Sequence, residues 1–276
     1  MVTDGQPEIA VAFEKVSLAF DDLVVMKELS FTVPRGSMRV LLGASGSGKS
    51  LILKLTLGLL RPDSGTIIVN GNRVTEMPEL ELLKMRADVG MVFQENALFD
   101  SLTVAENVGY RLYEETDMAL DAVRARVEEV LAFLGLRDFI DRMPSELSGG
   151  QRRRVGIGRA MASKPQLMLF DDSTTGLDPV ISATVDDEIV KLRDLEQVTS
   201  IVVTQQIRDA MYIATHKTVQ ANGKLEVVKV EDSEVTDTEF MVMHEGRIVF
   251  QGSAAELLAS KDPYLQRFLY RTMPPW

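Results

Sequence analysis

The sequence contains no cysteine, only two histidines and no long hydrophobic run. Without cysteine, disulfides, iron–sulfur clusters, thiol nucleophiles and cysteine zinc sites are excluded. His216 and His244 do not share the spacing of two metal ligands on one helix, so we expect no transition-metal site built by the protein. No stretch approaches the roughly 18 apolar residues of a membrane span, and the N-terminal residues lack the basic and apolar regions of a signal peptide. These absences predict a soluble cytoplasmic protein.

Basic residues are scarce relative to acidic ones. The chain of 276 residues has 30 Lys and Arg against 41 Asp and Glu, which gives a formal charge of −11 at pH 7. Because nucleic acids attract proteins through clustered Lys and Arg, this balance argues against a nucleic-acid partner. One basic run, Arg152, Arg153 and Arg154, lies on a predicted helix, where consecutive residues fan around the axis. We expect this run to face solvent or another subunit.

Short apolar segments alternate with helical patterns along the chain, which predicts an α/β fold. Hydrophobic residues make up 45% of the sequence and charged residues 26%, as in an ordinary globular protein. Strands are expected at 9–13, 29–33, 38–42, 66–70, 88–93, 166–172 and 200–204. The strand at 166–172 is apolar until its final carboxylates, as in a parallel sheet that is covered on both faces.

Residues 95–163 have helical patterns, and we interpret them as a helical subdomain inserted into the α/β core. Two helices, one over 117–134 and one beginning at Pro179, have apolar residues on one side. The residues expected to face inward are Val123, Val127, Val130, Leu131 and Leu134 in the first helix, and Ile181, Val185, Ile189, Leu192 and Leu195 in the second. Residues 217–243 alternate like a hairpin with an acidic connection, which we interpret as a β insertion without chemistry of its own.

A phosphate-binding motif follows the strand at 38–42. Residues 43–50, GASGSGKS, fit the pattern G-x-x-x-x-G-K-[ST] directly after a strand and before a helix. Glycines allow consecutive backbone N–H groups to turn toward one anion, and the helix N-terminus adds a positive dipole end. Lys49 would reach the β and γ phosphates, and the Ser50 hydroxyl would bind Mg²⁺. The alternative is a Gly-rich turn between a strand and a helix. The residues expected to bind nucleotide here are Gly43, Ala44, Ser45, Gly46, Ser47, Gly48, Lys49, Ser50 and Leu51.

Two further segments have more than one interpretation. Asp171 ends the strand at 166–172, where its carboxylate could hold Mg²⁺ through water or cap a following helix. The string LSGGQ at 147–151 is rare by composition and can begin a helix with Ser148 as its N-cap. A Gly-rich helix N-terminus is also an anion site, so the two roles of this string are compatible.

The P-loop, Gln94, LSGGQ and LMLFDD occur in the order typical of the ATPase subunit of an ABC transporter, and the resemblance covers nearly all of 8–258. This resemblance implies a P-loop NTPase fold with a mixed sheet core, an antiparallel β-subdomain and the inserted helical subdomain, and it implies ATP and Mg²⁺ as ligands. In the family, two subunits sandwich two nucleotides in a head-to-tail dimer. The residues that would then contact the partner's ATP in trans are Ser148, Gly149, Gly150 and Gln151.

The resemblance also assigns roles to three residues outside the P-loop. Gln94 matches the family's glutamine that senses Mg²⁺ and the attacking water. Asp178, in the sequence GLD, matches an aspartate at the dimer contact. Phe20 falls where the family stacks an aromatic ring on adenine, although a Phe buried in the β-layer is the alternative.

Two segments, 95–112 and 246–269, are similar to the ATPases of the Mce/Mla lipid-transport group. That resemblance implies a subunit on the cytoplasmic face of a bacterial inner membrane that moves phospholipids or other lipids between that membrane and the cell envelope. The implied partners are a second ATPase subunit, an integral-membrane permease and an MCE-domain lipid-binding protein. The region after Gln94 is where family members contact the permease's coupling helix. An ABC importer for another substrate is an alternative.

Two residues depart from the family pattern. Asp172 stands where active members have a glutamate that polarises the attacking water, and Gln205 stands where they have a histidine that contacts the γ-phosphate. The Asp172 side chain is one methylene shorter than glutamate, which draws its carboxylate back from the attacking water. Since misplacing a catalytic group by about 1 Å can cost on the order of 100-fold in rate, we expect ATP binding to persist and hydrolysis to be slow. Alternatively, Asp172 is a competent base in a shifted loop, or the protein is an ATP-binding regulator with little hydrolysis. A non-transport ABC protein on DNA or ribosomes is disfavoured by the negative charge.

The C-terminal tail, 259–276, contains an apolar stripe of Tyr264, Phe268 and Leu269. We expect it to pack either on a partner or on the protein's own core.

Overall fold

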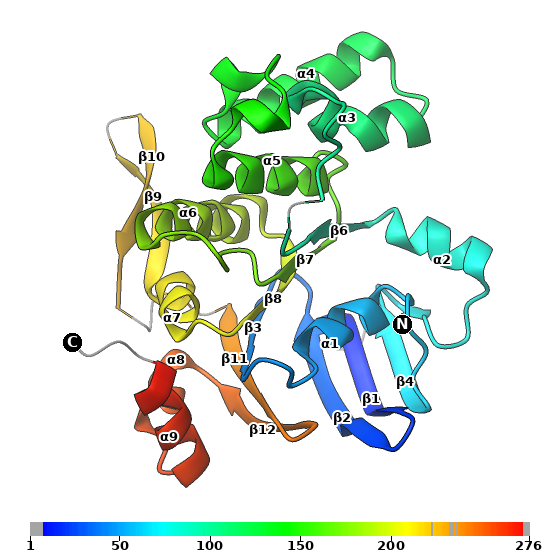
Figure 1. Cartoon of the computed structure of the whole chain (residues 1–276), viewed down its shortest axis with the longest axis vertical. Helices are drawn as coiled ribbons and strands as arrows, with labels where there is room; N and C mark the ends of the chain where they lie inside the picture. Colours follow the sequence, from blue (N-terminus) through cyan, green and yellow to red (C-terminus); the bar gives the residue numbers. More distant parts are fainter. Residues whose placement is uncertain (1–7, 96, 222, 232–234, 236, 273–276) are drawn as a thin grey trace.

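A six-stranded sheet forms the centre of the computed structural model, which describes residues 8–95, 97–221, 223–231, 235 and 237–272 (Figure 1). Its strands, in spatial order, are β12 (Arg247–Gly252), β11 (Thr238–His244), β3 (Met38–Gly43), β8 (Thr199–Thr204), β7 (Leu167–Asp171) and β6 (Val89–Val92). The strands from β11 to β6 run parallel, and β12 is antiparallel to β11. The carboxyl ends of β3, β8 and β7 therefore meet at one edge of the sheet, where ligands bind in open α/β folds.

A second sheet is fully antiparallel and packs with helix α1 (Lys49–Thr56). Its strands, in spatial order, are β2 (Leu23–Pro34), β1 (Ile9–Phe20), β4 (Ser64–Val69) and β5 (Asn72–Arg73). Helix α2 (Glu79–Arg86) connects this sheet to β6. In Figure 1, α1 lies between this sheet and the central one.

The remaining helices lie beyond the other face of the central sheet or in a separate lobe at one end of the molecule (Figure 1). The lobe holds α3 (Val104–Glu115), α4 (Leu120–Phe133), the 3₁₀ turns Arg137–Phe139 and Pro144–Glu146, and α5 (Gly149–Met161). Helices α6 (Pro179–Glu196) and α7 (Ile207–Thr215) follow β7 and β8 respectively. A Thr103 capping box with Glu106 fixes the start of α3.

Each buried strand of the central sheet contributes to two cores, because successive side chains point to opposite faces. In β3, Val40 and Leu42 join the core formed with the helices, whereas Leu41 joins the core formed with α1 and the antiparallel sheet. The first four residues of β7 are buried in the same alternating way, which confirms the prediction of a parallel strand covered on both faces.

The inward faces predicted for two helices are largely confirmed. All five predicted residues of the first helix are buried, but Leu195 of the second is 42% exposed, so that prediction is wrong. Arg193 occupies the inward side of the last turn of α6, where its guanidinium donates to the carbonyls of Ile213 and His216. Leu195 is about 200° further around the helix and therefore faces solvent.

The β insertion expected at 217–243 is shorter than predicted. Strands β9 (His216–Ala221) and β10 (Lys224–Lys229) form a separate antiparallel pair, but 238–243 belong to β11 of the central sheet. Both segments alternate with a period of two, so the alternation cannot identify the strand with which each pairs. Residues 232–234 and 236 of the acidic connection lie outside the described residues.

The C-terminal tail packs on the protein's own core. Helix α8 (Ala254–Ala259) leads into α9 (Pro263–Thr272), and Phe268 and Leu269 of α9 are buried in the core on the helical face of the sheet. Tyr264 stacks on His244 of β11, with ring centroids 3.6 Å apart. The last four residues of the tail lie outside the described residues. No helix in the described ranges is both long enough and apolar enough to cross a membrane.

Candidate nucleotide-binding site

The loop at 43–48 connects β3 to α1 and is held in a conformation that requires glycine. Gly48 is the N-cap of α1 and has φ +96°, a left-handed conformation that glycine adopts without strain. At Gly43, a Cβ atom would lie 2.7 Å from the carbonyl oxygen of Met243 on the neighbouring strand β11. Ala44 and Ser45 are exposed at the tip of the loop. The backbone of the loop therefore meets the requirement for wrapping around an anion.

Lys49 places a buried cation inside this loop. Its Nζ donates to the carbonyl oxygens of Gly43 and Ala44, each at 3.0 Å, and the residue is 5% exposed. Burial lowers the pKa of Lys49, while the nearby Asp172 and Asp171 carboxylates raise it. The hydroxyl oxygen of Ser47 is buried and has no hydrogen-bond partner among the described residues. A buried ammonium and an unpaired hydroxyl beside a Gly-rich loop fit the phosphates of a nucleotide.

Ser50 and Asp171 form the part of the site that suits a cation. The Ser50 hydroxyl donates to Asp171 Oδ1 at 2.7 Å, although 121 residues separate them in the chain. Burial raises the pKa of Asp171, and the hydrogen bond from Ser50 opposes that increase. Hydroxyl and carboxylate oxygens are ligands that Mg²⁺ accepts, so these two side chains fit the metal. The interpretation of Asp171 as a helix cap is wrong, because it is the last residue of β7 and α6 begins only at Pro179.

The two departures from the family pattern lie in contact. Oδ1 of Asp172 accepts a hydrogen bond from the backbone N–H of Gln205 at 3.1 Å, and the Asp172 N–H donates to Val203 at 2.9 Å. Asp172 has φ +44°, a left-handed conformation that Asp tolerates better than most residues. Gln205 lines a cavity of about 420 Å³ together with Ala44 and Ser45. The structure thus brings 172 and 205 to the same side of the loop at 43–48.

The LSGGQ segment begins α5, in the separate helical lobe. The Ser148 hydroxyl accepts from the Gln151 N–H at 3.3 Å, and the Gln151 side chain accepts from the Ser148 N–H at 2.8 Å. This capping box confirms Ser148 as the N-cap. A Cβ on Gly150 would lie 2.3 Å from Cγ2 of Ile181, so glycine lets α5 approach α6. Within the described residues, no hydrogen bond joins 147–151 to 43–51.

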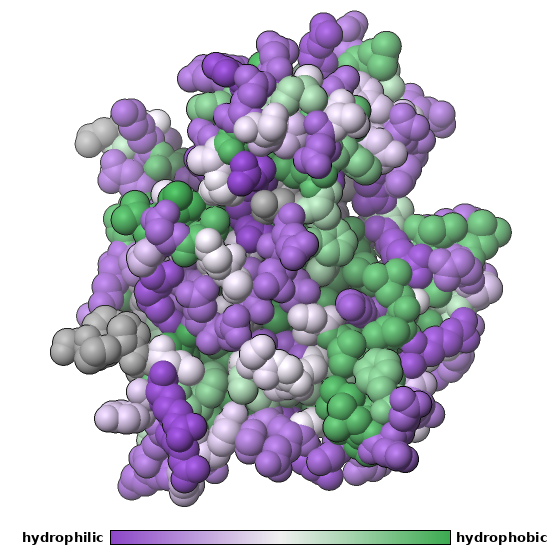
Figure 2. Space-filling view, in the orientation of Figure 1, coloured by the Kyte–Doolittle hydropathy of each residue, from purple (hydrophilic) through white to green (hydrophobic). Residues whose placement is uncertain are grey.

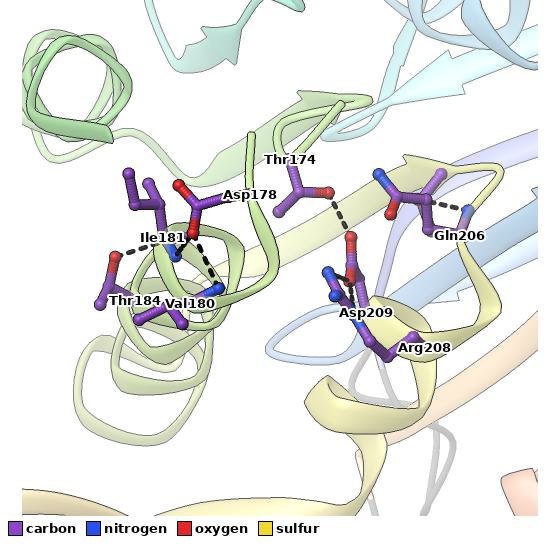
Figure 3. A network of polar contacts seen from close by, with 9 residues as sticks. Thr174, Asp178, Val180, Ile181, Thr184, Gln206, Arg208 and Asp209 are labelled. Carbon is purple, nitrogen blue, oxygen red and sulfur yellow. Dashed lines mark hydrogen bonds and ion pairs between the residues drawn. The ribbon is translucent and has the colours of Figure 1, made fainter. Parts of the chain in front are cut away.

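Asp178 has a clear role within the chain. Its Oδ1 accepts from the N–H groups of Val180 and Ile181, both at 3.0 Å, and so caps α6 (Figure 3). The same view shows the Thr174 hydroxyl pointing at the carboxylate of Asp209 on α7, to which it donates. These bonds fix the 173–178 loop at both ends, and Asp178 itself is exposed. Its role at a dimer contact stays a prediction.

Gln94 and Phe20 both have exposed side chains. Gln94 is exposed in the loop after β6, and its side-chain amide makes no hydrogen bond to any described residue. Phe20 ends β1 and is 45% exposed, so its interpretation as a buried Phe of the β-layer is wrong. Both side chains remain accessible to a ligand.

Arg153 is a residue whose position the sequence analysis missed. It is 3% exposed, so the expectation that the run 152–154 faces solvent or another subunit is wrong for its central member. Its guanidinium donates to the backbone carbonyls of Phe93 and Gln94. The helical period contained the signal, because Gly150, Arg153 and Ile157 follow the spacing of a buried face.

Comparison with known proteins identifies the family. A sequence model described as ABC transporter matches residues 26–175, which is more than half of the chain. The chain belongs to the ABC transporter family. The fold predicted from its motifs is therefore confirmed, including the mixed central sheet, the antiparallel sheet and the helical lobe.

Curated relatives of this ABC protein differ in how much of it they match. The intermembrane phospholipid transport ATP-binding protein MlaF of Escherichia coli K12 is 33% identical over 94% of the chain and 88% of its own length. The chloroplast protein TRIGALACTOSYLDIACYLGLYCEROL 3 of Arabidopsis thaliana is 33% identical over 96% of the chain and 74% of its own length. The sulfate/thiosulfate import protein CysA of Synechococcus elongatus is 40% identical over 80% of the chain, which spans only 62% of that relative.

Solved ABC cassettes have the same architecture. The ATP-binding cassette MJ0796, a dimer in a post-hydrolysis state bound to ADP and phosphate, aligns with 88% of the chain and 98% of its own, with a TM-score of 0.72 and 26% identity. The structure of cbiO1 from Clostridium perfringens covers 96% of both chains with a TM-score of 0.78, and at 24% identity it supports the fold alone.

We expect Gly150→Ala to lower the free energy of unfolding by about 1–3 kcal/mol, because the added methyl group would overlap Ile181 and force α5 away from α6. Chemical denaturation measures the change. Gly149→Ala is the matched control, since its Cβ would lie 3.3 Å from Leu177 and should cost less. Equal stability of both variants would contradict the packing role of Gly150.

Proposed function

We propose that the protein binds and hydrolyses ATP as the motor subunit of an ABC transporter. The buried ammonium of Lys49 inside the Gly-rich loop carries this proposal, since it needs anionic partners to replace the water it has lost. Bound Mg²⁺ would neutralise charge on the β and γ phosphates. Ser50 and Asp171 would hold the metal, with Gln94 completing the set from the loop after β6. The exposed ring of Phe20 would stack on adenine.

Two copies of the chain are needed for a complete site in this proposal. Ser148 and the N-terminus of α5 are accessible in the helical lobe and make no hydrogen bond to the described part of their own P-loop. A helix N-terminus stabilises an anion, so Ser148, Gly149, Gly150 and Gln151 would contact the γ-phosphate bound by a second subunit. The MJ0796 cassette is a dimer, which supports a pair of subunits; the proposed pair is head-to-tail, with Asp178 at the contact.

A permease would bind beside the loop that contains Gln94. An open cavity of about 350 Å³ lies between β6, α3 and α5 and is lined by Phe93, Phe99, Tyr110 and Arg111. Phe93 and Phe99 are 41% and 40% exposed, and the Phe99 ring lies 4.4 Å from that of Tyr110. The surface is indented between the helical lobe and α2 (Figure 2). Exposed aromatic rings around a hollow suit an inserted helix of a membrane partner, which would hold the protein on the cytoplasmic face of the inner membrane.

Lipid is the substrate class that we propose. The match to MlaF covers 94% of the chain, whereas the match to the sulfate importer CysA covers 80% of it. The Arabidopsis relative, which matches 96%, is named after a galactolipid. This difference in coverage supports a lipid transporter. The proposed partners are a permease and an MCE-domain lipid-binding protein. An importer for another substrate is the second candidate, because CysA and the methionine import protein MetN have the higher identity of 40%.

Hydrolysis is proposed to be slow. The Asp172 carboxylate is one methylene shorter than glutamate and already accepts from the Gln205 N–H, so it is drawn toward its own backbone. Gln205 can donate a hydrogen bond to a phosphate but cannot supply a positive charge. Both changes weaken orientation and charge stabilisation during phosphoryl transfer and leave the loop around Lys49 intact.

Replacing Lys49 with alanine should abolish MgATP binding, because the loop would lose its buried cation. Isothermal titration with the purified protein measures this binding, and Lys54→Ala, five residues further along α1, is the matched control. If the wild-type protein does not bind MgATP, or if Lys49→Ala binds it as tightly as the wild type does, the proposed function is wrong.

The double substitution Asp172→Glu with Gln205→His should raise ATP turnover by roughly 10-fold or more, since it restores the reach and the charge that the wild type lacks. Steady-state phosphate release measures turnover. Nucleotide affinity should stay near the wild-type value. An unchanged rate in the double variant would show that the surrounding loop already compensates for both residues.

Isolation of the native complex tests the substrate class. Affinity purification of the tagged chain from its own membranes should recover an integral-membrane permease and an MCE-domain protein, and the reconstituted complex should move phospholipid between vesicles only with ATP. Recovery of a sulfate-binding or methionine-binding protein instead would reject the lipid proposal in favour of an importer.

A further inference from the structure

Arg153 connects three segments that the chain uses to build its site. It lies on α5, five residues after Ser148. One guanidinium nitrogen, Nη1, donates to the carbonyl oxygen of Phe93 at 2.8 Å and to that of Gln94. The other, Nη2, donates to the carbonyl oxygen of Thr175 at 3.5 Å. A side chain on the helix that begins at LSGGQ thus bonds both the loop after β6 and the loop before α6.

The charge of Arg153 is not neutralised in the described part of the chain. None of the ion pairs there includes Arg153, burial lowers its pKa, and its Nε has no hydrogen-bond partner. Burying a guanidinium without a neighbouring carboxylate costs free energy unless its N–H groups donate hydrogen bonds to other acceptors. The carbonyls of the two loops therefore supply most of its solvation. Because the guanidinium is planar and rigid, it holds those carbonyls at fixed relative positions.

The position of Gln94 depends on this contact. Its backbone carbonyl is bonded to Arg153, while its side chain has no bond to a described residue and is free to reach a ligand. Lys49 and the loop at 43–48 make no hydrogen bond to Arg153. Loss of Arg153 should therefore displace Gln94 and the 173–178 loop and leave the phosphate-binding loop intact.

We propose that Arg153 is a positioning residue that sets the relative placement of Gln94, the Asp178 loop and the Ser148 helix tip. This inference rests on the proposed function for its effect on hydrolysis. A shift of the loop that contains Gln94, beside which the permease is proposed to bind, would pass through the Arg153 guanidinium to the 173–178 loop and the start of α5. These two segments would contact the second subunit and its nucleotide. The link is a contiguous set of hydrogen bonds between named atoms, so it can be cut at one residue.

Arg154 provides a matched control on the same helix. Its Nη1 donates to the carbonyl of Leu134 at 3.0 Å, and its Nε is likewise buried without a partner. Leu134 belongs to the helical lobe and not to the site loops. Arg154→Gln thus removes a partly buried guanidinium hydrogen bond to a backbone carbonyl without touching Gln94 or the 173–178 loop.

Hydrogen exchange of the nucleotide-free, full-length protein tests the positioning role directly. Arg153→Gln should increase amide exchange in both 93–95 and 173–176 by at least several-fold, whereas Arg154→Gln should leave both segments near wild type. Arg153→Lys, which keeps the charge but reaches fewer carbonyls, should give an intermediate result and replaces the Gln variant if that one does not fold. Unchanged exchange in both loops overturns the proposal.

Kinetics of the same variants test its consequence. Arg153→Gln should lower kcat by about 10- to 100-fold and raise the Mg²⁺ concentration for half-maximal rate, with the Kd for MgATP within about twofold of wild type. Arg154→Gln should change none of the three. A folded Arg153→Gln variant with wild-type kcat and Mg²⁺ dependence overturns the proposal. If the wild type binds no MgATP while the loops respond in hydrogen exchange, the proposed function fails and the positioning role stands.

Discussion

The parallel register of three strands is the constraint on which the candidate site depends. Pairing of β3 with β8 sets Leu42 opposite Thr204, and pairing of β7 with β8 sets Asp171 opposite Val203. The residues that follow each strand therefore emerge at the same edge of the sheet. Ser50 can reach Asp171, and Asp172 can reach the backbone of Gln205, only because this register is kept. A shift of one residue would turn alternate side chains to the opposite core and separate these groups.

Two buried cations hold loops of the candidate site, and both are bonded to backbone carbonyls. Lys49 bonds the carbonyls of its own loop, and Arg153 bonds those of two loops on other elements. A carbonyl satisfies a cation less fully than a carboxylate does, so each side chain keeps some capacity for an anion or a rearranged loop. Such sites suit a protein that must bind a charged ligand and then respond to it.

The contact between Asp172 and Gln205 gives a physical account of how the chain accommodates its departures from the family pattern. Asp tolerates the left-handed backbone at 172, and its short side chain closes a hydrogen bond to the next strand's loop. The Asp172 carboxylate therefore has a hydrogen-bond donor within its own chain. The same hydrogen bond orders the Asp172 carboxylate and, in the proposed function, keeps it further from a bound phosphate. In the proposed function, nucleotide binding and turnover therefore depend on different residues.

The amino-acid sequence by itself determined the features that depend on local chemistry. The loop at 43–50, the N-cap at Ser148, the buried strands and the apolar face of α4 all follow from motif and period, which neighbouring residues decide. Only the tertiary structure decided which backbone carbonyls Arg153 bonds, the assignment of 238–243 to the central sheet and the packing of α9 on its own core. These features depend on contacts between segments that lie tens of residues or more apart in the chain. The spacing of apolar residues along a strand or helix is the same whichever partner it packs against, so that spacing cannot identify the partner.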